Sequence, residues 1–380
     1  MNQGSGWLPG SESISSRFPR GYEFSEFDER DAPWRAEAYT AGLGRRGAGE
    51  FKASAGWTTS PLAVDLNLSL VDLRDWCSPV RDQGFLDSCT AFAVVALREF
   101  LMNRARQPVV ELSPRYLWYL GREQAGNQHE NTGLKPRDAL HALLHGGCSP
   151  EEYDPYPPAA FSRRADQKLK GDGEDTRTSL PEFVLRYQHA WAHATDQDEL
   201  VEAASREPTL QAVYAAKRFT ISAYHAIFLD EQAEQASRRY YDAMKDATEP
   251  NVPSFISPHE QRRRASVNTS DPVQALRDVK TSLERGYGLI LAGNVYADFL
   301  DPEVSASGVL PELTDHQLRY PVSSHCLFVA GYIQIGGDDR GYLICKNSLG
   351  SSWGDRGYAY MPFSYFSQRG AVLEVWTAQA

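Results

Sequence analysis

Residues 71–104 read VDLRDWCSPVRDQGFLDSCTAFAVVALREFLMNR, and the second half of this stretch predicts a helix through the centre of a hydrophobic core. The helix is apolar on nearly every face, through Ala91, Phe92, Val94, Val95, Leu97, Phe100 and Leu101. Asp87 and Ser88 stand just before it as candidate caps. Cys89 then falls in the first turn, where unpaired backbone N–H groups and the positive end of the helix dipole favour a thiolate over a thiol.

The residues around Cys89 carry a second signal. Asp82-Gln83-Gly84 is followed by Ser88-Cys89 and then by Ala91-Phe92. This order resembles the nucleophile segment of papain-like cysteine peptidases, in which a Gln six residues before the Cys supplies a donor for the oxyanion. The local match is partial, because the family's Cys-Gly-Ser-Cys-Trp is Leu86-Asp87-Ser88-Cys89-Thr90 here. A buried structural cysteine is the alternative interpretation of Cys89.

Two further segments extend the resemblance. His325 begins the apolar, β-like run HCLFVAGY, which is similar to the family's histidine segment. Asn347 follows in KNSLGSSWGDRGY, which is close to the family's Asn-Ser-Trp-Gly segment, with Leu349 in place of the first Trp and with Trp353-Gly354 retained. A buried strand histidine is the alternative for His325 by itself. The joint order of Gln, Cys, His and Asn favours the papain-like interpretation, as a bacterial-type member with insertions.

The resemblance implies an α+β fold of two lobes. The expected left lobe is helical, with the central helix carrying Cys89, and the right lobe is antiparallel and β-barrel-like. It implies a cysteine peptidase that hydrolyses peptide bonds through a thioester acyl-enzyme. Cys89 would be the nucleophile, His325 the base and acid, and Asn347 the group that orients His325, while Gln83 and the Cys89 backbone N–H would hold the oxyanion. Trp353 is a candidate substrate-binding residue.

Asp87, two residues before the nucleophile, has two interpretations. Its carboxylate would favour Lys or Arg before the scissile bond if it faces the substrate. Otherwise it caps the central helix. The same charge would oppose thiolate formation at Cys89.

Two other functions remain open at this stage. The same Cys-His-Asn arrangement supports acyl transfer or peptide ligation if water is excluded. Alternatively, the chain is a catalytically silent papain-like binding protein, because the departures at Asp87 and Leu349 both fall beside the site.

Composition excludes several other classes. The chain of 380 residues has a formal net charge of −11, which argues against nucleic acid or an anionic membrane as a partner. Its five cysteines are widely spaced and form no Cys-x-x-Cys pair, which is typical of reduced thiols. The pairs His141/His145 and His189/His193 lack a third ligand, so no metal or cofactor is expected. The N-terminus has no signal-peptide pattern, which predicts a cytoplasmic protein or one exported by a signal-independent route.

The expected organisation has two parts. Residues 1–70 lack a sustained period and are expected to form an extended segment, a possible pro-segment. Residues 71–380 form the peptidase domain, with charged, Ala-rich helical insertions within 161–270 that would select a protein or peptide substrate or bind a partner or regulator. Inside these insertions we expect helices over 180–193, 197–205 and 226–247, and a strand over 217–225. Later strands are expected at 289–295, 321–332, 341–347, 357–361 and 371–376.

Overall fold

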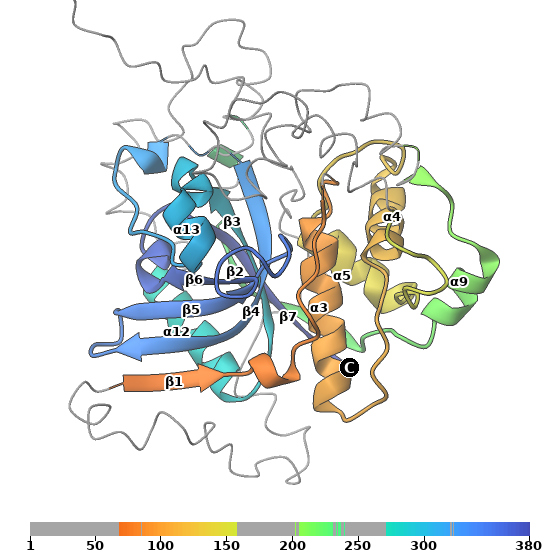
Figure 1. The fold of residues 1–380 in the computed structure, drawn as a ribbon, viewed down its shortest axis with the longest axis horizontal. Helices are drawn as coiled ribbons and strands as arrows, with labels where there is room; N and C mark the ends of the chain where they lie inside the picture. Colours follow the sequence, from red (N-terminus) through yellow and green to blue (C-terminus); the bar gives the residue numbers. More distant parts are fainter. Residues whose placement is uncertain are drawn as a thin grey trace, which may run out of the picture.

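A computed structural model describes residues 68–157, 205–230 and 271–380, apart from 85, 320 and 322, together with a few helical positions between 202 and 239. In this part of the chain a group of helices lies against one side of a twisted antiparallel sheet (Figure 1). The α+β fold of helical and strand-rich lobes is therefore confirmed. None of the described helices is long and apolar enough to cross a membrane.

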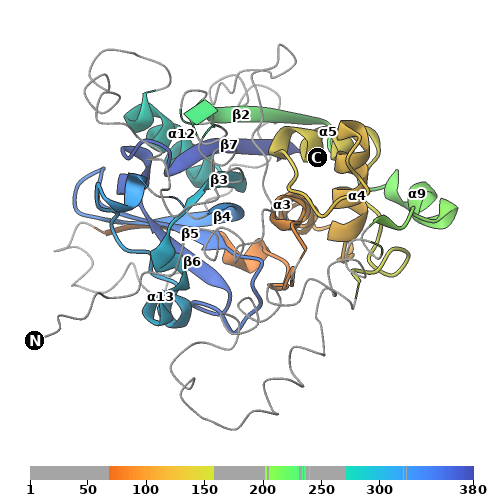
Figure 2. The same cartoon turned by 90° about the horizontal axis from the view of Figure 1, so that it is seen from above.

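The central helix α3, Cys89–Arg104, is buried along almost its whole length. It lies between the sheet and the helices α4, Pro114–Ala125, and α5, Pro136–His145 (Figure 2). Ser88 is its N-cap residue, but the Ser88 side chain makes no capping hydrogen bond and instead contacts the hydroxyl of Tyr156 at 2.7 Å. Ser113 caps α4, since its Oγ accepts from the Tyr116 N–H at 3.0 Å.

The sheet contains seven strands in the order β2-β7-β3-β4-β5-β6, and β1 pairs with β4 outside this path. All of these pairings are antiparallel, as predicted, and the sheet does not close into a barrel. The strands are β1 Leu68–Asp72, β2 Ala223–Leu229, β3 Leu289–Val295, β4 Ser323–Ile335, β5 Gly341–Lys346, β6 Tyr358–Pro362 and β7 Val372–Gln379. The five strands expected after residue 288 are all present, and β3 has the predicted bounds.

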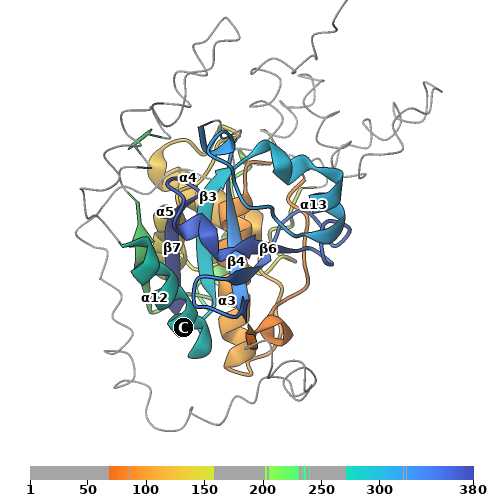
Figure 3. The same ribbon diagram turned by 90° about the vertical axis from the view of Figure 1, so that its left-hand side faces the viewer.

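On the side away from α3, the sheet is flanked by α12, Pro272–Glu284, and α13, Pro302–Ser307 (Figure 3). The amphipathic helix α12 is capped by Asp271, whose Oδ1 accepts from the Val273 N–H at 3.0 Å. Short 3-10 turns complete this side, including Ala297–Leu300, which follows β3. The connection from β3 to β4 is the one that borders the site described below.

Two of the predictions for the region of the insertions are wrong in their bounds. The strand expected over 217–225 begins at Ala223, because residues 217–220 form a turn after the short helix α9, Leu210–Ala216. Residues 226–229 were predicted to be helical and belong to β2, where the backbone pairs with β7 across Phe228 and Val375. Pairing with a neighbouring strand thus overrides the helical preference of an Ala-rich pattern. Residues 1–67 and most of 161–270, including the helix expected over 180–193, lie outside the described residues.

Candidate active site

His325 and Asn347 meet at the end of the sheet where β4 begins and β5 ends. His325 Nε2 lies 2.8 Å from Asn347 Oδ1, and the backbone N–H of Ser348 donates to the same oxygen at 2.8 Å. A backbone N–H only donates, so the Asn347 atom that it meets is the amide oxygen. His325 must therefore carry its proton on Nε2, and Nδ1 is left as an acceptor for a thiol proton.

The backbone beside His325 is tightly packed. His325 pairs with Gly293 of β3, and a Cβ at Gly293 would lie 2.1 Å from the carbonyl oxygen of Ala371. Only glycine fits at this close approach of two strands. The packing of β3 and β7 therefore fixes the backbone from which the imidazole projects.

Cys89 is the first residue of α3, and its side chain has no exposed surface. Burial raises the pKa of the thiol to about 12, and the charge of Asp87 acts in the same direction, against a backbone hydrogen bond at Cys326. Burial lowers the pKa of His325 to about 4, against the hydrogen bond with Asn347. In this structure both groups are therefore neutral at pH 7.

Gln83 connects the segment before α3 to the segment after β5. Its Nε2 donates to the carbonyl of Leu86 at 2.9 Å, and its Oε1 accepts from the Ser348 hydroxyl at 2.7 Å. The backbone N–H of Gln83 also donates to the Ser348 carbonyl at 2.8 Å. Because the Leu86 carbonyl only accepts, these contacts fix which way the amide faces, and its second N–H remains available to another acceptor. Hydrogen bonds thus link the segment of Gln83 to the segment that carries Asn347, and Asn347 in turn bonds to His325.

The two predicted substrate-binding residues are covered in this structure. The side chain of Trp353 is fully buried, and Asp87 is nearly so. The backbone N–H of Asp87 donates to Asn131 Oδ1 at 2.9 Å. The roles of Asp87 and Trp353 toward a substrate stay predictions.

Phe299 is a site residue that the sequence did not reveal. Its ring centroid is 5.9 Å from that of His325, edge-on, and 5.2 Å from that of Trp353, with 26° between the stacked planes. Phe299 comes from the 3-10 turn between β3 and β4, and no motif of the sequence analysis contains it. Only the fold brings this turn to His325.

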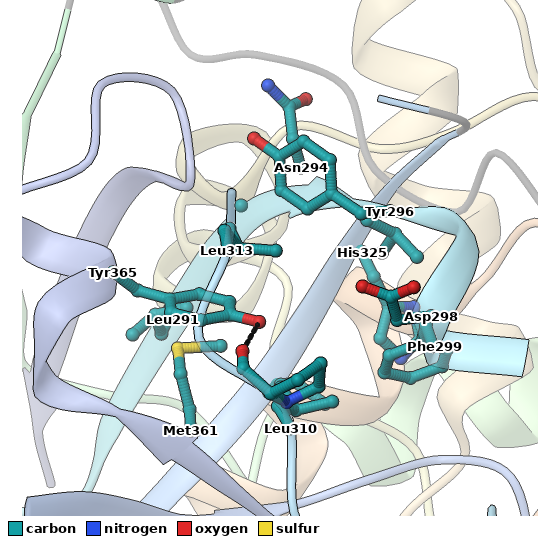
Figure 4. Close-up of a pocket in the computed structure, with 14 residues that line it drawn as sticks. Leu291, Asn294, Tyr296, Asp298, Phe299, Leu310, Leu313, His325, Met361 and Tyr365 are labelled. Carbon is teal, nitrogen blue, oxygen red and sulfur yellow. Dashed lines mark hydrogen bonds between the residues drawn. The ribbon is translucent and has the colours of Figure 1, made fainter. Parts of the chain in front are cut away.

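A pocket opens beside His325 and Phe299 (Figure 4). Its floor comes from Leu291 and Leu327 of the sheet. The other lining residues are Gly293, Asn294, Val295, Tyr296, Asp298, Leu310, Pro311, Leu313, Met361 and Tyr365. The pocket is thus largely apolar, and the segment between β3 and β4 supplies most of one side.

A buried polar network joins α3 to β5 on the other side of Asn347. Glu99 of α3 accepts from Ser78 Oγ, from Arg81 NH2 at 3.1 Å and from the Leu112 N–H at 2.9 Å. Lys346 of β5 donates to Ser78 Oγ at 2.9 Å. Burial lowers the pKa of Lys346 to about 8. We call Ser78, Arg81, Glu99 and Lys346 the seam network.

The other cysteines and the pair His141/His145 are the remaining candidates that fall within the described residues. All five cysteines fall in the described ranges, and each is a free thiol. His141 and His145 lie with ring centroids 4.3 Å apart. Within residues 68–157, 205–230 and 271–380, no group of three or more His, Cys, Asp or Glu side chains is arranged to hold a metal ion. His189 and His193 lie outside the described residues.

Comparison with known proteins gives distant similarities. No family model matches the chain. A 104-residue segment is 23% identical to an uncharacterized peptidase C1-like protein of Acanthamoeba polyphaga mimivirus and covers 27% of this chain but only 32% of that protein. The structure is similar to xylellain, a cysteine protease from Xylella fastidiosa, with a TM-score of 0.55, 18% identity, and coverage of 95% and 97% of the two chains. It is also similar to digestive procathepsin L 3 of the Tenebrio molitor larval midgut, with a TM-score of 0.51, 17% identity, and coverage of 97% and 79%.

Proposed function

We propose that this chain, which has the fold of the papain-like cysteine proteases, is a cysteine peptidase that uses Cys89, His325 and Asn347 to hydrolyse peptide bonds. The supporting observation is the buried hydrogen bond of 2.8 Å between His325 Nε2 and Asn347 Oδ1. It sets the tautomer that a general base for a thiol needs, and the Cys89 thiol hydrogen-bonds with the backbone at Cys326, the residue after His325.

The proposed reaction has two stages. His325 Nδ1 takes the thiol proton of Cys89, and the thiolate sulfur attacks the substrate carbonyl carbon. The Cys89 backbone N–H and the second amide N–H of Gln83 bind the oxyanion, and the imidazolium protonates the leaving amine as the peptide C–N bond breaks. Water then attacks the thioester, gives a proton to His325, and releases the acid and the free thiol.

Burial controls when this chemistry starts. Cys89 has no exposed surface, so a substrate reaches it only after the site opens. The same burial raises the pKa of Cys89 and lowers that of His325. Entry of water or substrate dipoles reverses both shifts, and each change favours the thiolate–imidazolium pair. Opening the site and activating the nucleophile are therefore one event in this proposal.

The test uses the full chain and its single-residue variants. Cys89→Ala and His325→Ala should each abolish cleavage of a peptide library, measured by mass spectrometry, while the melting temperature stays close to that of the wild type. Cys326→Ala is the matched control, because it removes a buried thiol next to His325 and should retain activity. Cleavage by Cys89→Ala would contradict the proposal.

An epoxide that traps thiolates separates the other two candidate functions. A peptidase or an acyl transferase should be labelled at Cys89, whereas a silent binding protein should not react there. Adding a primary amine in excess then distinguishes hydrolysis from transfer, because an acyl transferase should give the amide of that amine as the main product.

The residues between β2 and α12 are proposed to select large substrates or to bind a regulator. Because β2 belongs to the sheet, a deletion that tests this role has to start after Asp230. Removing residues 240–270 should change kcat/KM for a folded protein substrate more than for a short peptide. Equal changes for both substrates would exclude the role.

A further inference from the structure

The His325–Asn347 hydrogen bond is covered in an unusual way in this chain. At the position where the resembled family has a Trp, this chain has Leu349, which carries no aromatic ring. The imidazole and the amide are nevertheless almost completely buried. Side chains other than an indole at position 349 therefore cover the imidazole.

Phe299 is in the position to do this. It lines the same pocket as His325, and its ring lies edge-on to the imidazole (Figure 4). The same ring stacks on Trp353, whose side chain is fully buried. Phe299 thus contacts both the indole and the imidazole, although it precedes His325 by 26 positions and Trp353 by 54.

We propose that Phe299 is a positioning residue for His325, which holds the plane of the imidazole toward Asn347 and excludes water from their hydrogen bond. Its aromatic ring reaches the site from the β3–β4 connection, whereas Leu349 has no aromatic ring. The expected effects on kcat rest on the proposed function, whereas the effect of Phe299 on the position of the imidazole does not.

The physical expectation follows from the two contacts. Edge-to-face aromatic pairs add a preference for one geometry beyond the area that they bury. A leucine of similar volume fills the space but gives the imidazole no such preference. Phe299→Leu should therefore lower kcat roughly tenfold and change KM less than about twofold, because the substrate is still bound while the base is less often aligned. Phe299→Tyr keeps the ring and should stay within about twofold of the wild type.

A second measurement does not depend on activity. In the Cys89→Ala background, with histidine labelled for NMR, the imidazole of His325 should titrate well below its ordinary pKa because it is buried. Adding Phe299→Ala admits water, so the pKa should move up toward 6.5. Asp298, the charged group lining the same pocket, is unchanged in this comparison. The added Phe299→Tyr change should leave the titration where it was.

The matched control is Phe366→Leu. Phe366 is buried in the same lobe, contacts Phe228 at 6.2 Å between centroids, and is not among the pocket residues. It should lose stability as Phe299→Leu does, but it should keep kcat and the His325 titration. The proposal is overturned if Phe299→Leu keeps the wild-type kcat, or if Phe299→Ala leaves the His325 pKa unmoved. If the wild type cleaves nothing while the NMR shift appears, the proposed function fails and the positioning contact stands.

Discussion

The two halves of the candidate site are held in different ways. His325 is fixed by direct contacts: a hydrogen bond to Asn347, a ring contact with Phe299, and a strand backbone packed against Gly293. Cys89 is held as the first residue of a buried helix and by a hydrogen bond of its thiol with the backbone at Cys326, while its burial opposes ionisation. The difference teaches that the proposed base is already arranged in the closed protein, whereas the reactivity of the proposed nucleophile depends on access of solvent or substrate.

The largest effect on stability is expected in the seam network, which joins α3 to β5. Glu99→Ala removes the buried carboxylate of the seam network and leaves Arg81 and Lys346 without it. Losing one partner of a buried ion pair costs about 3–5 kcal/mol. We expect this loss in the free energy of unfolding measured with urea. Glu111→Ala is the matched control, since Glu111 also pairs with Arg81, at 3.2 Å, but is 62% exposed and should cost under about 1 kcal/mol. Equal losses would show that burial is not the cause.

A somewhat smaller effect on the free energy of unfolding is expected from His325, and it should depend on pH. The pKa of His325 is about 4 in the folded protein, below its ordinary value of 6.5. Unfolding therefore takes up a proton between these pH values, so the contribution of His325 to stability is complete above pH 6.5 and is lost as the pH falls toward 4. The loss should reach at most about 3 kcal/mol. Urea unfolding at pH 7.5, 6 and 5 should give a shallower slope for His325→Gln, and parallel slopes would contradict the assignment.

Asn347→Ala should have a moderate effect on the base alone. A hydrogen bond to a charged group contributes about 1.5–3 kcal/mol, which corresponds to a loss of roughly 10- to 150-fold in kcat/KM. The variant should be slower but not inactive, because Asn347 orients the imidazole and exchanges no proton. Asn103→Ala, which removes an amide bonded to the Trp76 carbonyl far along α3, should leave kcat/KM unchanged. Complete inactivity of Asn347→Ala with an intact fold would require another role for this residue.

The smallest effect is expected for Asp87→Asn, which tests the nucleophile. The Asp87 charge raises the pKa of Cys89, so its removal should let the thiol react with iodoacetamide at lower pH, with a change in rate below about tenfold. If Asp87 also faces the substrate, the preference for Lys or Arg before the cleaved bond should disappear from a peptide-library profile. Asp138→Asn, in the first turn of α5, controls for loss of a charge elsewhere. An unchanged thiol titration would exclude the electrostatic contribution.

Much of the fold could be predicted because its signals are local. The buried character of α3, the Ser113 cap of α4 and the bounds of β3 each follow from residues adjacent in the sequence. The positions of Cys89 and His325 in their elements followed in the same way. The His325–Asn347 contact was expected from the resemblance, and only the coordinates give its geometry.

Other features could not be predicted because they depend on pairing between distant segments. Ser78 and Lys346 are 268 positions apart, so no local pattern connects them to Glu99. Phe299 lies in a turn with no recognisable pattern, and residues 226–229 at the end of β2 precede an Ala-rich helical pattern, so their strand pairing becomes evident only from β7. In each case the determining contact has no counterpart in the local sequence.

The pairing of β1 with β4 has a consequence for the newly made protein. Leu68 of β1 pairs with Ile335, so the first described strand has no partner until nearly the whole chain has left the ribosome. Cys89 is likewise synthesised 236 residues before His325. Contacts between such distant residues form late, because long loops must close first. A nascent chain thus carries the Cys89 thiol for many seconds, at about 5–20 residues per second, before His325 has been made.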